Sequence, residues 1–153
     1  MTQEQKITIT GPAGALDARW QAADQSRLGV LMCHPHPLFH GTMDNKVVTT
    51  VTRTAAGLGL PTLRFNFRGV GKSQGMFDQG EGELSDAASA LDWMQDLNPN
   101  APYVWIAGFN FGAWIGMQLL MRRPEIEGFI SVAPPANLYD FSFLAPGSST
   151  EEV

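Results

Sequence analysis

The sequence contains one cysteine, Cys33, in 153 residues. A single thiol excludes an intrachain disulfide, so a reducing cytoplasm is the simplest setting for this chain. Positive charge is also scarce, with ten Lys and Arg residues against fifteen Asp and Glu and a net charge of −5. The basic residues are scattered, which argues against nucleic-acid and anionic-membrane partners, because both favour clustered Lys and Arg.

The sequence also lacks a clear membrane segment. Its first ten residues are polar and contain no apolar signal core. The most apolar run, residues 101–121, includes a GxxxG match at "GAWIG". Asn110, Gln118 and several glycines interrupt this run, and no basic flank precedes it. A buried strand, turn and helix explains it better than a transmembrane helix, so we expect a cytoplasmic protein without a membrane partner.

What the chain does have is a regular succession of apolar patterns. Its length and its hydrophobic content of 44% predict one globular domain, residues 1–153. "KITIT" and "ALDARWQA" alternate around "GPAG", which predicts an antiparallel hairpin. The continuous apolar run at residues 28–33 predicts a strand buried on both faces, and residues 62–67, 103–108 and 128–133 predict three further strands.

Helical spacing fills the intervals between these strands. Apolar residues recur in this way from Val47 to Leu58, with Asp44 or Asn45 as the N-cap. A second face contains Leu84, Ala87, Ala88, Leu91, Met94 and Leu97, and a third helix follows at 111–123. The alternation predicts an α/β fold: a mainly parallel sheet, covered on both faces, with an N-terminal antiparallel hairpin. Ligands bind outside the carboxyl ends of such strands, so the site should lie among the loops 34–45, 67–82, 109–112 and 134–146.

One of these loops, "GFNFG" at 108–112, has the form of a nucleophile elbow, G-x-S-x-G. The central residue is Asn110, whose amide is a poor nucleophile. An elbow requires positive φ at that position, and Asn is among the few non-glycine residues that tolerate it. Asn110 can therefore keep the geometry while removing the attacking atom, and the N–H of Phe111 would still lie at a helix N-terminus that favours anions.

Five segments, in this order, resemble a bacterial family of small α/β-hydrolases related to dienelactone hydrolase: CHPHPLFHGTMDNKVV, TLRFNFRGVGKSQGMFD, GELSDAASALDWM, IAGFNFGAWIGMQLL and SVAPPANLYDFSFLAP. The resemblance extends over about residues 6–146 and is most specific at the HPHP loop, the "NFRGVGKSQG" loop and the elbow. It implies the α/β-hydrolase fold and hydrolysis of a carboxylic ester or similar acyl bond, without a cofactor.

The resemblance also implies roles for single residues. The family's elbow serine falls on Asn110, and Phe111 would donate one oxyanion-hole N–H. We assign the second N–H to His36, with Leu38 in reserve, because the two prolines of that loop have no N–H. The residues expected to contact substrate are His34, Leu38 and Arg68.

The chain departs from the family in two respects. Asn110 replaces the serine, and all three histidines precede it, whereas in this fold the acid and the histidine follow the nucleophile. Asp140 is the one acidic residue after the elbow that we expect near the site. Family members usually continue for two more strands, so we expect an incomplete domain. In it, residues 128–133 would form an exposed sheet edge prone to self-association.

Three other motifs suggest sites for which we favour a structural explanation. The HPHP loop has a metal-like H-x-H spacing, but its prolines restrict the backbone, so we expect it to shape a turn and hold no metal. "NFRGVGKS" nearly matches a P-loop, yet Asn66 replaces the first glycine and no helix pattern follows. We interpret it as a pocket wall with Arg68 in an ion pair. Cys33 and His34 are adjacent on a strand and should point to opposite faces, which favours a buried structural thiol.

The predicted function is therefore that of an esterase-like hydrolase lineage whose ligand is a small acyl or ester compound. The Ser-His-acid mechanism needs a hydroxyl, a base and an orienting carboxylate, and at least two of these are missing. We expect weak or no turnover from this polypeptide. The alternative is a non-catalytic member of the fold that binds a small molecule or a partner.

Overall fold

The computed structural model describes residues 3–23, 28–97, 103–135 and 150–152. Its elements, in chain order, are β1 (Gln5–Gly11), β2 (Gly14–Gln21), β3 (Leu28–Cys33), the 3-10 turn η1 (Pro37–Phe39), α1 (Lys46–Gly57), β4 (Thr62–Phe65), α2 (Glu81–Leu97), β5 (Tyr103–Phe109), α3 (Phe111–Arg122), β6 (Ile126–Val132) and β7 (Thr150–Glu152).

The strands form one mixed sheet in the order β1-β2-β4-β3-β5-β6-β7. β1 pairs antiparallel with β2, and β2 pairs antiparallel with β4. The pairs from β4 through β3, β5 and β6 to β7 are parallel. The predicted fold class, with its N-terminal hairpin, is confirmed. The edge prediction is wrong in one respect: β7 pairs with Phe129–Ser131 of β6, so part of β6 is an interior strand.

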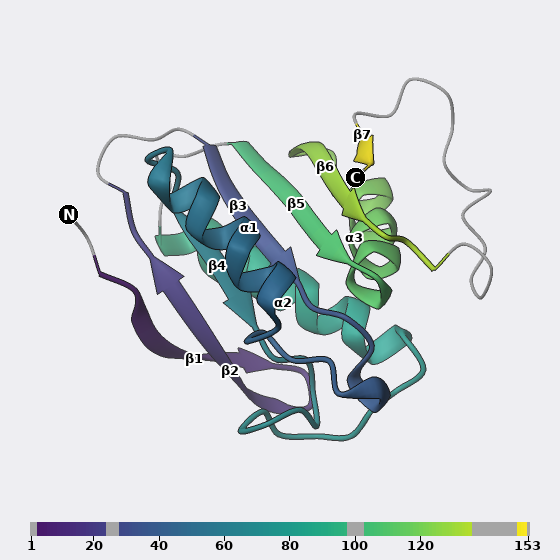
Figure 1. Ribbon diagram of the computed structural model, residues 1–153. Coiled ribbons are helices and arrows are strands. Elements are labelled where there is room, and N and C mark those ends of the chain that lie inside the picture. The colour runs from purple at the N-terminus through teal and green to yellow at the C-terminus, as the bar shows by residue number, and fades with distance from the viewer. Residues whose placement is uncertain (1–2, 24–27, 98–102, 136–149, 153) are drawn as a thin grey trace.

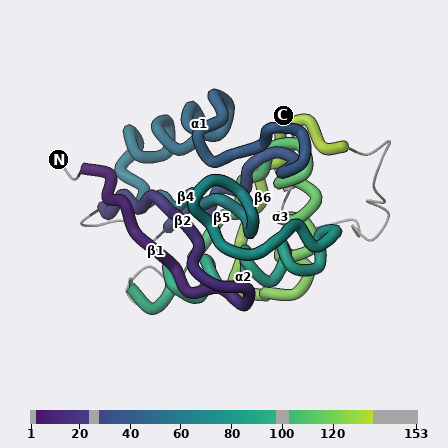
Figure 2. The backbone as a smooth tube through the Cα atoms, turned by 90° about the horizontal axis from the view of Figure 1, so that it is seen from below, coloured from purple at the N-terminus to yellow at the C-terminus, as the bar shows by residue number. Residues whose placement is uncertain are grey.

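The helices form a layer on each face of this sheet. Figure 1 shows α1 in front of the strands and α2 and α3 behind them, and Figure 2 shows α1 and α2 on opposite sides of the sheet. Residues along β3 alternate accordingly: Leu31 and Cys33 face the larger core under α2 and α3, while Val30 and Met32 face the smaller core under α1. A strand buried on both faces needs a continuous apolar run, which is the pattern of 28–33.

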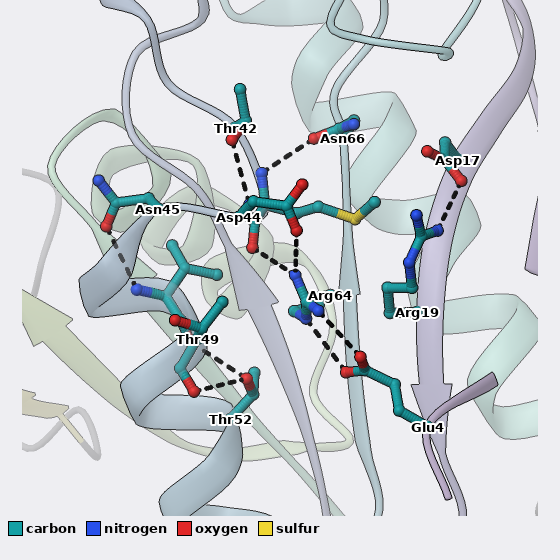
Figure 3. Close-up of polar contacts among 12 residues, drawn as sticks. Glu4, Asp17, Arg19, Thr42, Asp44, Asn45, Thr49, Thr52, Arg64 and Asn66 are labelled. Carbon is teal, nitrogen blue, oxygen red and sulfur yellow. Dashed lines mark hydrogen bonds and ion pairs between the residues drawn. The ribbon is translucent and has the colours of Figure 1, made fainter. Parts of the chain in front are cut away.

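The start of α1 is held by two sets of polar contacts. Asn45 is the N-cap, because its side-chain oxygen accepts hydrogen bonds from the N–H groups of Val47 and Val48 at 2.8 and 3.3 Å. Arg64 of β4 donates to the Met43 carbonyl at 2.7 Å and pairs with Asp44 and Glu4 at 2.8 and 2.9 Å (Figure 3). These contacts fix the chain between the 34–41 loop and α1.

The expected strand 62–67 ends at Phe65, because the next residue begins a loop with its own hydrogen bonds. Asn66 accepts from the Met43 N–H at 2.9 Å, and its carbonyl accepts from the Ser73 hydroxyl at 2.7 Å. The Ser73 oxygen in turn accepts from the Asp17 N–H of β2 at 2.9 Å. The loop 66–80 is thereby fastened to the sheet on one side.

On its other side the same loop is fastened to α2 by two buried carboxylates. Asp86 is fully buried and accepts from the Arg68 N–H at 2.9 Å and from its guanidinium at 2.8 Å. Glu83, also fully buried, accepts from the N–H groups of Asp78 and Gly80 at 2.9 and 2.8 Å. The expected Arg68 ion pair is confirmed. The expected apolar face of α2 was incomplete, because it omitted these acids, and Leu97 is 52% exposed.

Removing the Asp86 carboxylate should therefore destabilise the fold strongly. Asp86→Ala leaves a buried guanidinium without its main partner, and we expect a loss of about 3–5 kcal/mol in the free energy of unfolding. Asp96→Ala, at an exposed position of the same helix, should change it by less than about 0.5 kcal/mol. Urea denaturation of both variants measures this, and equal losses would contradict the assignment.

Candidate active site

The predicted elbow is present between β5 and α3. Asn110 has φ of 57° and ψ of −120° and is the N-cap of α3. The expected positive φ is confirmed, whereas ψ differs from the left-handed helical value of about +47°. Such a conformation costs about 1–3 kcal/mol at a non-glycine residue and persists only where neighbouring structure imposes it.

Backbone hydrogen bonds on both sides impose that conformation on Asn110. Its N–H donates to the Val132 carbonyl of β6 at 2.9 Å, which continues the pairing of β5 with β6. Its carbonyl accepts from the N–H groups of Ala113 and Trp114 at 2.9 and 3.4 Å, which begins α3. The half-buried side chain makes no capping hydrogen bond. Within the described part of the chain, the side-chain amide of Asn110 therefore makes no hydrogen bond that stabilises the fold.

The two glycines of the motif are required because backbone passes close to each. A Cβ at Gly112 would collide with the carbonyls of Cys33 and His34, and one at Gly108 would collide with the carbonyl of Gly112. The loop that follows β3 thus lies directly against the elbow. This contact places the HPHP loop and residues 108–112 side by side, as expected.

His34 lies in the core beside this contact. Its ring is fully buried and packs edge-on against Phe67, with the ring centroids 4.7 Å apart. Its Nε2 accepts the Phe67 N–H at 3.0 Å, so Nδ1 carries the proton and donates to the Pro35 carbonyl at 2.6 Å. Burial lowers the pKa of His34 to about 4, against the opposing effect of the Pro35 carbonyl. The ring joins two loops, and this placement offers no exposed atom for the predicted substrate contact.

His36 lies beside the elbow. Its ring centroid is 4.8 Å from that of Phe111, the first residue of α3, and 5.2 Å from that of Phe77. Its carbonyl accepts from the N–H groups of Phe39 and Gly41, both at 3.0 Å. The His36 N–H donates no hydrogen bond within the described residues, which leaves that group available to a ligand. Leu38 is not an equivalent reserve, because its N–H donates to Nδ1 of His36 at 3.1 Å.

Apolar side chains are exposed on the loops that follow β3 and β4. Leu38 and Phe39 of η1 are 62% and 73% exposed, and Met76 in the facing loop is 83% exposed. The Phe39 ring packs on the His36 ring, with 4.8 Å between centroids. Arg68 as a whole is only 9% exposed and its guanidinium is held by Asp86, so it supports the loop that carries Phe77. Asp140 and most of the predicted 134–146 loop lie outside the described residues.

Two other candidate nucleophiles are inaccessible. Cys33 is fully buried, and burial raises the pKa of its thiol to about 12, which makes it unreactive at neutral pH, as expected from the sequence. Ser131 of β6 pairs with Gly108 and is also fully buried. Its hydroxyl has no hydrogen-bond partner within the described residues. Neither group can attack a ligand that approaches from solvent.

A cavity lies elsewhere, on the α1 face of the sheet. It has a volume of about 420 Å³ and an apolar lining that includes Val30, Trp105 and Ile130 of the strands and Val51 and Leu58 of the α1 region. Its lining contains no residue of the elbow or of the HPHP loop. No helix in the described part of the chain combines the length and apolar character needed to cross a bilayer.

The contact at Gly112 generates a stability prediction. Gly112→Ala places a methyl group against two carbonyls and should cost about 1–3 kcal/mol in the free energy of unfolding. Gly57→Ala is the matched control: no atom lies within 4 Å of the added Cβ, and it ends a helix. It should be neutral or stabilising by up to about 1 kcal/mol. Thermal and urea unfolding of both variants measures these changes. An unchanged free energy of unfolding in Gly112→Ala would refute the close approach.

The low pKa of His34 generates a prediction about acid stability. The unfolded chain binds a proton at this residue below pH 6.5, whereas the folded chain does so only near pH 4. Stability is therefore fully present above pH 6.5 and falls as the pH drops to about 4, by roughly 3 kcal/mol from this group. His34→Gln should lose this part of the pH dependence in urea denaturation. Parallel pH profiles for the two proteins would show that His34 does not titrate this way.

Comparisons with known proteins agree with the geometry. The family model of X-Pro dipeptidyl-peptidase (S15 family) matches residues 13–150. The protein RP471 of Rickettsia prowazekii is 52% identical over 145 residues, which are 92% of this chain and 61% of that relative. The chain thus spans less than two thirds of the length of this curated relative.

Two crystal structures are also similar. The protein ATU1826 of Agrobacterium tumefaciens, a candidate α/β hydrolase, is 54% identical with a TM-score of 0.91, over 97% of this chain and 68% of that one. XC6422 of Xanthomonas campestris, described as an α/β serine hydrolase without a lid, is 35% identical with a TM-score of 0.90, over 98% and 70%. The elbow lies between β5 and α3, and the chain resembles these proteins in both sequence and structure. The chain therefore belongs to the α/β-hydrolases, in the family that the S15 model describes.

Proposed function

We propose that this chain is a catalytically impaired member of an ester-hydrolase lineage, which binds a small acyl compound at its elbow. The observation that supports this most is the backbone conformation of Asn110, which keeps the shape of a nucleophile elbow around a side chain that cannot attack. The amide nitrogen of Asn is not nucleophilic, because its lone pair is delocalised into the carbonyl. The lineage reaction would be hydrolysis of a carboxylic ester or similar acyl bond.

The oxyanion-binding half of the chemistry is better supported than the attacking half. Phe111 begins α3, so its N–H lies at the positive end of a helix dipole. The His36 N–H belongs to the loop that packs against Gly112. Two such donors would stabilise negative charge on an acyl oxygen. Without a nucleophile and a base, an oxyanion hole and binding leave only a residual part of the catalysis, about 10³–10⁴-fold over water.

His34, the buried histidine of the same loop, cannot act as the base. Both ring nitrogens of His34 are occupied by backbone groups, and the ring is fully buried. Cys33 and Ser131 are equally out of reach. These placements support binding with little or no turnover. The alternative, a non-catalytic binding member of the fold, is favoured by the exposed Leu38, Phe39 and Met76 beside the site.

Two measurements test the proposal. Wild-type protein should hydrolyse p-nitrophenyl butyrate at a rate within about tenfold of its Asn110→Ala variant, because neither has a nucleophile. Butyrate should shift the amide resonances of Phe111 and His36 in a titration of labelled protein, and leave those of exposed Thr50 on α1 unchanged. Robust ester hydrolysis that is abolished in Asn110→Ala would overturn the proposed impairment. Shifts spread evenly over α1 would overturn the binding site.

A further inference from the structure

We propose that the side chain of His36, in addition to its backbone N–H, contacts the acyl ligand: its neutral imidazole donates Nε2–H to the ligand's carbonyl or carboxylate oxygen. The identity of the ligand rests on the proposed function. The protonation state of the ring does not, because it follows from contacts within this chain.

The location of the ring proton follows from one hydrogen bond. The Leu38 N–H donates to Nδ1 of His36 at 3.1 Å, and the same contact caps η1. A ring nitrogen can accept only when it carries no proton. In the neutral ring the single proton must then be on Nε2. Protonating Nδ1 would set two N–H groups against each other and break the cap.

The ring's surroundings favour the neutral form. Three aromatic rings pack on His36, with centroids 4.8 Å away for Phe39, 5.2 Å for Phe77 and 4.8 Å for Phe111. Partial burial lowers the pKa of His36, and the negative charge of Glu83 on α2 acts in the opposite direction. Glu83 is itself engaged by two backbone N–H groups, of Asp78 and Gly80. At neutral pH the ring of His36 is therefore uncharged, and its surroundings are partly apolar.

The Nε2–H group remains accessible. It has no hydrogen-bond partner within the described residues, and it is not among the buried side-chain atoms that lack one. His36 as a whole is half-buried. Its ring leans on Phe111, the residue next to Asn110. A donor in this position can reach an acyl oxygen bound at the elbow, while Phe39 and Phe77 contact the apolar part of the same ligand.

This arrangement gives His36 the role of a donor and not of a base. The Nε2 nitrogen already carries its proton, so it cannot remove one from water or from a side chain at position 110. It can polarise a carbonyl, or bind a carboxylate, without a proton transfer. The preferred ligand class is therefore an acyl compound with an oxygen acceptor and a flanking alkyl or aryl group.

The first test reads the tautomer directly in the ligand-free protein. Long-range proton–nitrogen correlation spectra of 15N-labelled protein at neutral pH should show Nδ1 of His36 as an unprotonated nitrogen and Nε2 as a protonated one. A ring protonated at Nδ1, or a charged ring, would overturn the proposal whatever the protein binds. His34 provides an internal reference, because its contacts require the opposite tautomer.

The second test measures affinity for 4-phenylbutyrate by the same titration of amide resonances. His36→Phe keeps a flat ring and removes the donor, and should weaken binding about threefold to tenfold, the value of one neutral hydrogen bond. His36→Gln restores a donor and should recover part of the loss. His40→Asn is the matched control on the same loop, since Asn tolerates the φ of 64° there.

The outcomes separate this proposal from the one on which it rests. If wild-type protein binds and His36→Phe binds equally well, the donor role of His36 is wrong and the acyl site stands. If wild-type protein does not bind, the acyl site is wrong, and the donor role falls with it. Binding weakened in His36→Phe and partly recovered in His36→Gln, with His40→Asn unchanged, supports both.

Discussion

The site depends on one close approach between two pieces of backbone. The carbonyls of Cys33 and His34, at the end of β3, lie where a side chain on Gly112 would have to be. This contact is possible because β3 and β5 are parallel neighbours, so their carboxyl ends meet at the same edge of the sheet. It brings the loop with the predicted oxyanion donor to the N-terminus of α3. The buried rings of His34 and Phe67 pack against each other beside this contact.

The elbow can keep its shape with Asn110 at its centre because the demands of shape and of chemistry on position 110 are separate. Shape requires positive φ, which Asn accepts at a moderate cost. Chemistry requires an attacking oxygen, which Asn lacks. The surrounding bonds, from Asn110 to Val132 and from Ala113 to Asn110, involve only backbone atoms. They therefore do not depend on the identity of the side chain at position 110.

The sheet, its order of elements and the elbow could be predicted from the sequence because their signals are local. Apolar runs mark β3 and β5, the Asp44–Asn45 pair marks the start of α1, and paired glycines mark the elbow. The buried Asp86 of α2 could not be found by that route, since its pairing with Arg68 joins residues far apart in the sequence. Glu83 had a local signal, three residues after the turn at Gly80, that resembles a capping box. The burial of His34 and the bond from Leu38 to the His36 ring depend on how loops pack, which no periodicity records.

Every inference about the site depends on residues 108–112 forming a nucleophile elbow with the Asn110 amide at its centre. The most direct measurement is the pair of backbone torsion angles of Asn110 in a crystal structure of this chain. We expect φ near 57° and ψ near −120°, with Gly112 against the carbonyls of Cys33 and His34. A negative φ at Asn110 in a helix that continues through it, or a gap between Gly112 and residue 34, would contradict it.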